Sequence, residues 1–98
     1  MASHRLTRRA ERDLKRVLAY TRDTFGTYQT QAYAAGLDRM FGLIAEFPRI
    51  GIPADDLKPR YRRFRFEAHY IFYTEETDHI LIRAIIHTAQ NLRPALFR

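Results

Sequence analysis

The chain has 98 residues, 46% of them hydrophobic, which is the length and composition of one globular domain rather than of a disordered segment. It contains no cysteine, which excludes a disulfide framework and thiolate metal sites, and no apolar run approaches the roughly 18 residues of a membrane span. Seventeen lysines and arginines against eleven acids give a net charge of +6, which favours a polyanionic partner such as nucleic acid, the ribosome or an acidic peptide, although a merely solvated basic surface has the same composition.

The first residues carry charge with no apolar stretch behind it, so residues 1–5 do not resemble a secretory signal. Together with the missing cysteines, this predicts a soluble, cytoplasmic protein with no membrane contact. The short segment 3–6 is expected to be a strand.

Two helices are predicted next. Thr7 is expected to cap the first, which ends at Gly26, and Thr27 to cap the second, which Pro48 stops. Because only about two residues join them, the helices should form an antiparallel hairpin. Apolar residues at three- and four-residue spacing define one face of each helix: Ala10, Leu14, Val17, Leu18, Thr21 and Phe25 in the first, and Tyr33, Leu37, Phe41, Ile44 and Phe47 in the second.

Residues 48–59 contain three prolines and are expected to form a loop. From residue 60 onward the period changes to two, and three strands are predicted over 60–66, 69–74 and 80–87, with turns at 67–68 and 75–78. The last strand is almost continuously apolar, so it should be central and covered on both faces. Residues 90–97 are expected to form one or two helical turns, with Pro94 near their start.

These elements predict an α+β fold of order β-α-α-β-β-β over a single domain, residues 1–98. The simplest packing is an antiparallel twisted sheet with the N-terminal helical hairpin on one face. The other face is expected to stay partly open, rimmed by arginines and aromatic residues.

At this point the residues resemble a known family. Leu6-Thr7-Arg8-Arg9-Ala10-Glu11-Arg12-Asp13-Leu14 is similar to the ParE toxin pattern in which Leu-Ser/Thr precedes Ala-Glu-x-Asp-Leu, within the ParE/RelE toxin-antitoxin superfamily. Further matches follow in order and cover almost the whole chain: Tyr20-Thr21, Phe25-Gly26, Gln29, Tyr33, Phe47-Pro48-Arg49-Ile50-Gly51, Asp56-Leu57-Lys58, Arg62-Arg63-Phe64, His69-Tyr70-Ile71-Phe72-Tyr73 and Arg83-Ala84-Ile85-Ile86-His87.

The resemblance implies a toxin of a type II toxin-antitoxin system, neutralised in a hetero-oligomer by a ParD-like antitoxin. ParE-like toxins are implied to inhibit DNA gyrase without catalysis of their own, whereas RelE-like relatives are ribosome-dependent mRNA endonucleases. In the RelE branch, arginines or lysines on the middle strands and after the last strand, with a tyrosine or histidine near the C-terminus, cleave RNA. Direct binding of nucleic acid is left open by the sequence.

Most of that nuclease set is missing. Tyr70 rather than a basic residue follows His69, Thr88-Ala89-Gln90 contains no cation, and no tyrosine occurs after Tyr73. Arg63 and Arg65 remain, and a nuclease using these arginines with His87 is the alternative to a non-catalytic gyrase inhibitor. A third hypothesis is a basic interaction module without toxicity.

The segment 58–65 holds five cations and no acid, interleaved with aromatic residues. This pattern suits RNA and acidic peptides equally, and charges on an edge strand also discourage aggregation.

None of the four histidines has metal-ligand spacing, so no metal or cofactor is expected; His87 is a candidate for target binding, or else a half-buried hydrogen-bonding histidine. The candidates for target binding are Arg63, Arg65, Arg83, His87, Asn91 and Arg93. In the family a polar residue and then basic residues often follow the final histidine, and Asn91-Leu92-Arg93 departs slightly from that pattern. An amphipathic acidic antitoxin segment is expected in a groove between the helical hairpin and the sheet, with Leu14, Leu18, Tyr33, Leu37, Arg62 and Phe64 as candidates.

Overall fold

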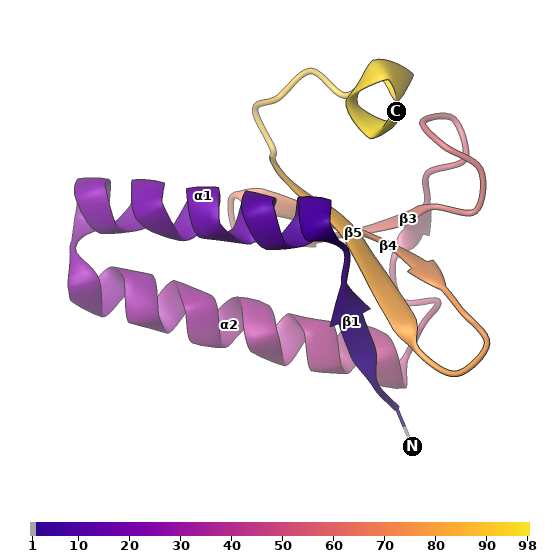
Figure 1. Ribbon diagram of the computed structural model, residues 1–98, viewed down its shortest axis with the longest axis horizontal. Coiled ribbons are helices and arrows are strands. Elements are labelled where there is room, and N and C mark those ends of the chain that lie inside the picture. The colour runs from indigo at the N-terminus through magenta and orange to yellow at the C-terminus, as the bar shows by residue number, and fades with distance from the viewer. Residues whose placement is uncertain (1) are drawn as a thin grey trace.

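A helical hairpin lies against one face of a five-stranded sheet in the computed structural model, which describes residues 2–98 (Figure 1). None of the helices in this range is long and apolar enough to cross a membrane. The elements in chain order are β1 (His4–Leu6), α1 (Arg8–Phe25), α2 (Thr27–Glu46), β2 (Ile52–Pro53), β3 (Arg62–Phe66), β4 (His69–Glu75), β5 (Ile80–His87) and the 3-10 helix η1 (Pro94–Phe97).

The caps of the two helices are partly those expected. The Thr7 hydroxyl accepts a hydrogen bond from the Ala10 N–H at 3.1 Å, which confirms it as the cap of α1. Thr27, however, is the first residue of α2 and not its cap. Gly26 alone joins the helices, because at φ +90° it turns the chain within one residue, donating to the Arg22 carbonyl and accepting from the Thr30 N–H. Phe47 also differs from expectation, since it follows the end of α2 and is 54% exposed.

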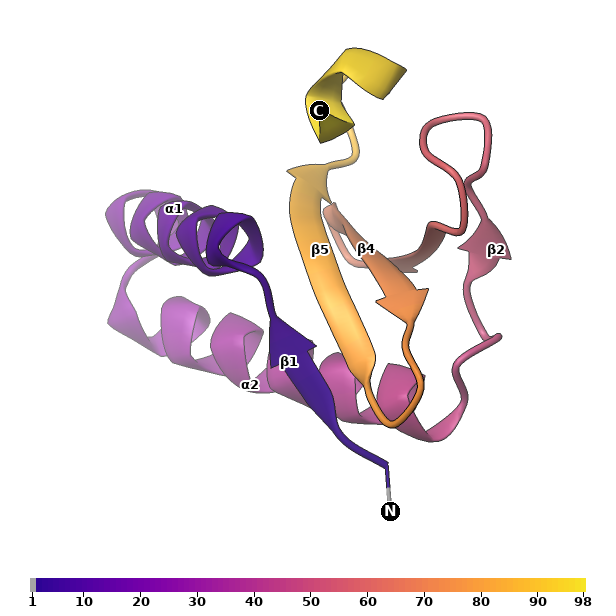
Figure 2. The same ribbon diagram turned by 45° about the vertical axis from the view of Figure 1, so that its right-hand side comes forward.

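The sheet has the order β1-β5-β4-β3-β2, so β5 is an interior strand as predicted. It is mixed rather than wholly antiparallel, because β1 runs parallel to β5 while β3, β4 and β5 form the expected antiparallel meander (Figure 2). A hairpin turn forces neighbouring strands to be antiparallel, but β1 and β5 are joined through the rest of the chain and escape that constraint. Within the predicted loop, β2 forms an additional two-residue strand on β3.

Apolar side chains form a core on each face of the sheet. On the helical face, Leu37, Phe41 and Ile44 of α2 pack against residues of β4 and β5. The opposite face is expected to be partly open, and η1 folds back over part of it. Phe97 lies 4.7 Å from the Phe72 ring between ring centres, and 5.7 Å from the Tyr61 ring. The second core consists of Ala54, Leu57, Tyr61, Phe72, Ala84, Ile86 and Phe97.

The outer edge of β5 is covered by a continuous N-terminal segment. β1 pairs with β5 only as far as Ile82. The next residue, Thr7, continues the hydrogen bonding to β5. Its N–H donates to the Ile82 carbonyl at 3.0 Å, and its hydroxyl donates to the Arg83 carbonyl at 3.2 Å. Further along α1, the Asp13 carboxylate accepts the Ile85 N–H at 3.0 Å. The start of α1 therefore satisfies backbone groups that the three-residue strand β1 cannot reach.

Replacing the buried Asp13 should destabilise the fold. Asp13→Ala removes the acceptor of the Ile85 N–H and the partner of the Arg9 guanidinium at 3.3 Å, so we expect a loss of roughly 1–3 kcal/mol in the free energy of unfolding. Urea denaturation measures it. Asp23→Ala, at an exposed position of the same helix, is the control and should stay within roughly 0.5 kcal/mol of wild type. Equal losses in the two variants would contradict the role of Asp13.

Candidate functional site

A groove of about 430 Å³ lies between α1, the ends of β4 and β5, and the C-terminal segment. Its floor is mainly apolar, from Val17, Ile85 and Leu96, and Tyr20, 63% exposed, stands at its side. The full lining is Arg9, Asp13, Arg16, Val17, Tyr20, His69, Ile85, Ile86, His87, Gln90 and Leu96.

Two arginines of α1 line this groove, and their surroundings differ. The Arg9 guanidinium is held by Asp13, donates to the Leu96 carbonyl and lies 5.6 Å from the centre of the Phe97 ring. It therefore ties the C-terminal segment to α1 and forms a wall of the groove. Arg16 is exposed and pairs with no carboxylate within residues 2–98. Arg16 thus supplies an available positive charge beside an apolar floor.

Two histidines that line the groove, His69 and His87, contact each other, and Tyr33 contacts His69 from α2. The Tyr33 hydroxyl lies 2.6 Å from His69 Nδ1, and the rings of His69 and His87 stand nearly perpendicular with centres 5.2 Å apart. His87 Nδ1 accepts the Ala89 N–H at 2.9 Å. Burial, and secondarily the neighbouring His87, hold the pKa of His69 below its usual value. Burial raises the pKa of Tyr33. Across the described part of the chain no three His, Cys, Asp or Glu side chains gather as a metal site would require.

The six predicted target-binding residues do not form one surface. The pairs Arg65–Tyr70 and Tyr70–Ile86 put Arg65 on the face of the second core, and Arg63 shares that face. His87 pairs with His69, one residue along β4, and so lies on the helical face. Asn91 and Arg93 are exposed in the C-terminal segment. The sequence could not reveal this separation, because the faces depend on the register between strands.

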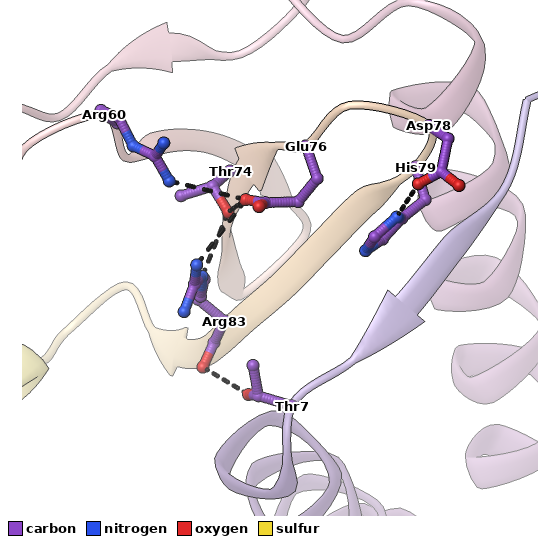
Figure 3. Close-up of polar contacts among 7 residues, drawn as sticks. All are labelled: Thr7, Arg60, Thr74, Glu76, Asp78, His79 and Arg83. Carbon is purple, nitrogen blue, oxygen red and sulfur yellow. Dashed lines mark hydrogen bonds and ion pairs between the residues drawn. The ribbon is translucent and has the colours of Figure 1, made fainter.

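Arg83, a further target-binding candidate, is used inside the protein (Figure 3). Its guanidinium donates to the Thr74 hydroxyl at 3.1 Å, lies 3.7 Å from Glu76 and faces the Tyr61 ring. Thr74 in turn donates to Glu76 at 2.6 Å, and Arg60 approaches the same carboxylate at 3.7 Å. The Thr74 hydrogen bond, followed by the two arginines, lowers the pKa of Glu76. Arg83 thus joins β4, β5 and the turn between them.

The predicted antitoxin-binding residues lie mostly between the hairpin and the sheet, where their side chains pack into the core. Leu37 has no exposed surface, and Leu14, Tyr33 and Phe64 pack against the same core. Leu18 is half-buried on α1, and Arg62 donates to the Gly51 carbonyl at 2.7 Å. Leu37 is therefore corrected to a core residue, because α2 packs directly on the sheet. The groove that does exist runs along the other flank of α1.

Sequence reasoning did not single out Arg16, Val17 and Tyr20 as site residues. The helical spacing predicts Val17 on the core face of the first helix, and Tyr20 belongs to the family pattern. Their common surface depends on where the C-terminal segment folds, since Leu96 and Gln90 complete the groove.

Comparison with known proteins points to one family. Residues 5–92 match the family model described as ParE toxin of type II toxin-antitoxin system, parDE. The chain is 34% identical to Toxin ParE1 of Caulobacter vibrioides over 96 residues, covering 98% of this chain and 99% of that protein. It is also 31% identical to Toxin ParE of Escherichia coli, covering 98% of this chain and 94% of that protein.

A solved structure has the same fold at lower sequence identity. A chain of the chromosomal ParDE TA system from P. aeruginosa superposes with a TM-score of 0.76 at 17% identity, covering 89% of this chain and 96% of that one. At this identity the likeness concerns the fold.

The buried His69 should make stability depend on pH. Because its pKa is lowered in the folded protein, the unfolded chain binds this proton more readily, so the free energy of unfolding should fall as the pH drops below about 6.5, the usual histidine pKa. His69→Gln should flatten this part of the pH profile, measured by urea unfolding between acidic and neutral pH. His4→Gln is the histidine control. Parallel profiles for wild type and His69→Gln would refute the assignment.

Proposed function

The chain belongs to the ParE toxin family of type II toxin-antitoxin systems, and on that premise we propose that a ParD-like antitoxin holds it inactive and that its target is DNA gyrase. The proposal places the protein in the cytoplasm, where gyrase acts. The observation that supports binding of an antitoxin is the groove beside α1.

The groove has the chemistry of a site for an amphipathic acidic segment. Val17, Ile85 and Leu96 offer an apolar floor, so the hydrophobic side of a partner helix or extended segment loses contact with water there. Arg16 supplies positive charge at one side. An acidic partner is further favoured by the net charge of +6, which accelerates encounter with a negatively charged chain.

The arrangement of residues supports a toxin without catalysis. Cleavage of RNA needs a base, a cation and an acid around one phosphate. The nuclease alternative relies on Arg63, Arg65 and His87, but these arginines and this histidine lie on opposite faces of the sheet. The other two arginines of β3, β4 and β5 are engaged within the protein, Arg83 with Glu76 and Arg62 with the Gly51 carbonyl. The family membership and this separation both favour inhibition by binding.

For gyrase binding we propose the part of the predicted set that is exposed. Arg65, His87, Asn91 and Arg93 are exposed, and the last three belong to the end of β5 and the C-terminal segment. Arg83 is removed from this set because its guanidinium stabilises the turn after β4.

Reversing the groove charge should weaken the antitoxin complex. With the antitoxin encoded beside this gene, Arg16→Glu should raise the Kd at least roughly tenfold at low salt, because it opposes like charges at the rim. It should also reduce the salt dependence of binding measured by calorimetry. Lys15→Glu makes the same charge change at an exposed neighbour outside the groove lining and is the control. Equal weakening by both variants would show that only overall charge matters.

The proposed inhibition of DNA gyrase is tested with purified gyrase. The folded chain at micromolar concentration should inhibit supercoiling and accumulate cleaved DNA, and an equimolar amount of antitoxin should reverse both effects. In parallel, primer extension on ribosome-bound mRNA should show no cleavage. Absence of any gyrase effect would refute the proposed target. Ribosome-dependent cleavage that disappears in Arg65→Ala would instead support the nuclease alternative.

A further inference from the structure

The outer edge of β3 is only partly covered. β2 pairs with Arg63 and Arg62 through Ile52 and Pro53, and then its pairing stops, while β3 continues to Phe66. Figure 2 shows β2 as a short arrow at this side of the sheet. The second half of β3 thus has a neighbour, β4, on one side only.

The register identifies which backbone groups are left at this edge. The Ala54 N–H donates to the Tyr61 carbonyl at 2.8 Å, so alternation makes Ile52 and Arg63 the next hydrogen-bonded pair. Arg65, two residues on, therefore directs its N–H and C=O to the same side. Ile50 would stand opposite it in this register, but the Ile50 N–H is turned to the Phe47 carbonyl at 3.0 Å. The Arg65 backbone thus faces outward beyond the end of β2.

A small hollow of about 200 Å³ lies beside this edge. Ile50 and Ile52, 41% and 56% exposed, form one side of it, and Tyr70 lies across β3. Exposed isoleucines next to an unfinished strand are unusual, because edges are normally protected by charge or proline. Pro53 protects the far part of β2, whereas the stretch at Arg65 carries arginine charge and no proline, so it discourages other basic strands but not an acidic one.

Residues 58–65 form a basic cluster with five cations, and two of them, Arg63 and Arg65, line this hollow. In that cluster Lys58 donates to the Phe97 carbonyl, Arg60 pairs with Glu76, and Arg62 donates to the Gly51 carbonyl. The Arg63 guanidinium instead stacks 5.1 Å from the centre of the Tyr70 ring, and its buried Nε has no hydrogen-bond partner. An unsatisfied buried donor is costly, so binding that brings a carboxylate acceptor to the Arg63 guanidinium would be favoured.

We propose that this edge takes an extended acidic segment of the antitoxin by strand addition. The segment pairs its backbone with Arg65, places a carboxylate against the Arg63 guanidinium and an aliphatic side chain in the hollow. The antitoxin is the chosen occupant because both sites lie at the same end of the sheet. The hollow is on the face of the second core and the groove on the helical face, so a chain that occupies both must cross the end of the sheet beside the pairs Phe66–His69 and His69–His87. The inference rests on the proposed antitoxin partnership.

Residue-resolved hydrogen exchange by NMR tests the strand pairing, comparing the free chain with its complex with the antitoxin encoded beside this gene. We expect the exchange of the Arg65 amide to slow at least about tenfold on binding. A complex that forms while this exchange is unchanged overturns the inference and leaves the antitoxin partnership intact. Failure to form any complex overturns both. Protection by gyrase but not by the antitoxin overturns the choice of occupant.

The charge contact is tested by substitution. Arg63→Gln should raise the Kd for the antitoxin at least roughly tenfold, since it removes a charge-assisted hydrogen bond. Arg22→Gln, at an exposed position near the end of α1, removes the same charge away from both sites and should leave the Kd within about twofold. Unchanged amide dispersion in the NMR spectrum establishes that Arg63→Gln is folded. An unchanged Kd in the folded Arg63→Gln variant refutes the carboxylate contact.

Discussion

The need of the backbone N–H and C=O groups of β5 for hydrogen-bond partners determines much of this structure. This strand is buried on both faces, and its N–H and C=O groups need partners on both edges. β4 covers one edge, but β1 is too short to cover the other. Thr7 and Asp13 complete it, which fixes the start of α1 against the sheet and, through the single residue Gly26, the position of α2. Sheet and hairpin are therefore built as one unit.

The groove begins where this coverage ends. Asp13 and Ile85, the last bonded pair of the junction, are themselves in its lining. Beyond them α1 continues past the end of β5, and the C-terminal segment closes the third side through the contacts of Arg9 with Leu96 and Phe97. The interaction that secures α1 thereby also shapes the surface assigned to the antitoxin. Arg9 and Asp13 support this surface, whereas Arg16 is available to a partner.

The many arginines have two kinds of role. Arg60, Arg62 and Arg83 satisfy carboxylates and carbonyls of the protein itself, and their charge contributes to its stability. Arg16 is exposed, Arg65 is exposed and uses only its Nε, which donates to the Glu67 carbonyl at 3.1 Å, and Arg63 keeps an unsatisfied donor. Both kinds of arginine count equally toward the net charge of +6, so composition does not distinguish them. Only the neighbours of each guanidinium separate structural charge from charge that a partner can use.

The sequence alone determined the two helices, the strands β1, β3, β4 and β5 and their order, because helix and strand periods are local properties. The cap at Thr7, the turn at residues 67–68, the interior place of β5 and most of the stripe of α1 were predictable, but the strand β2 and the exposure of Phe25, assigned to that stripe and 62% exposed, were not. It also identified the family, from motifs spread along the chain. It did not determine the parallel pairing of β1, the second core under Phe97 or the connection through Gly26 alone. Nor did it separate Arg63 and Arg65 from His87, or place Leu37 in the core and the groove on the other flank of α1. These features depend on strand register and on contacts between distant segments, which a periodic pattern does not encode, so the candidate site was decided by the tertiary structure.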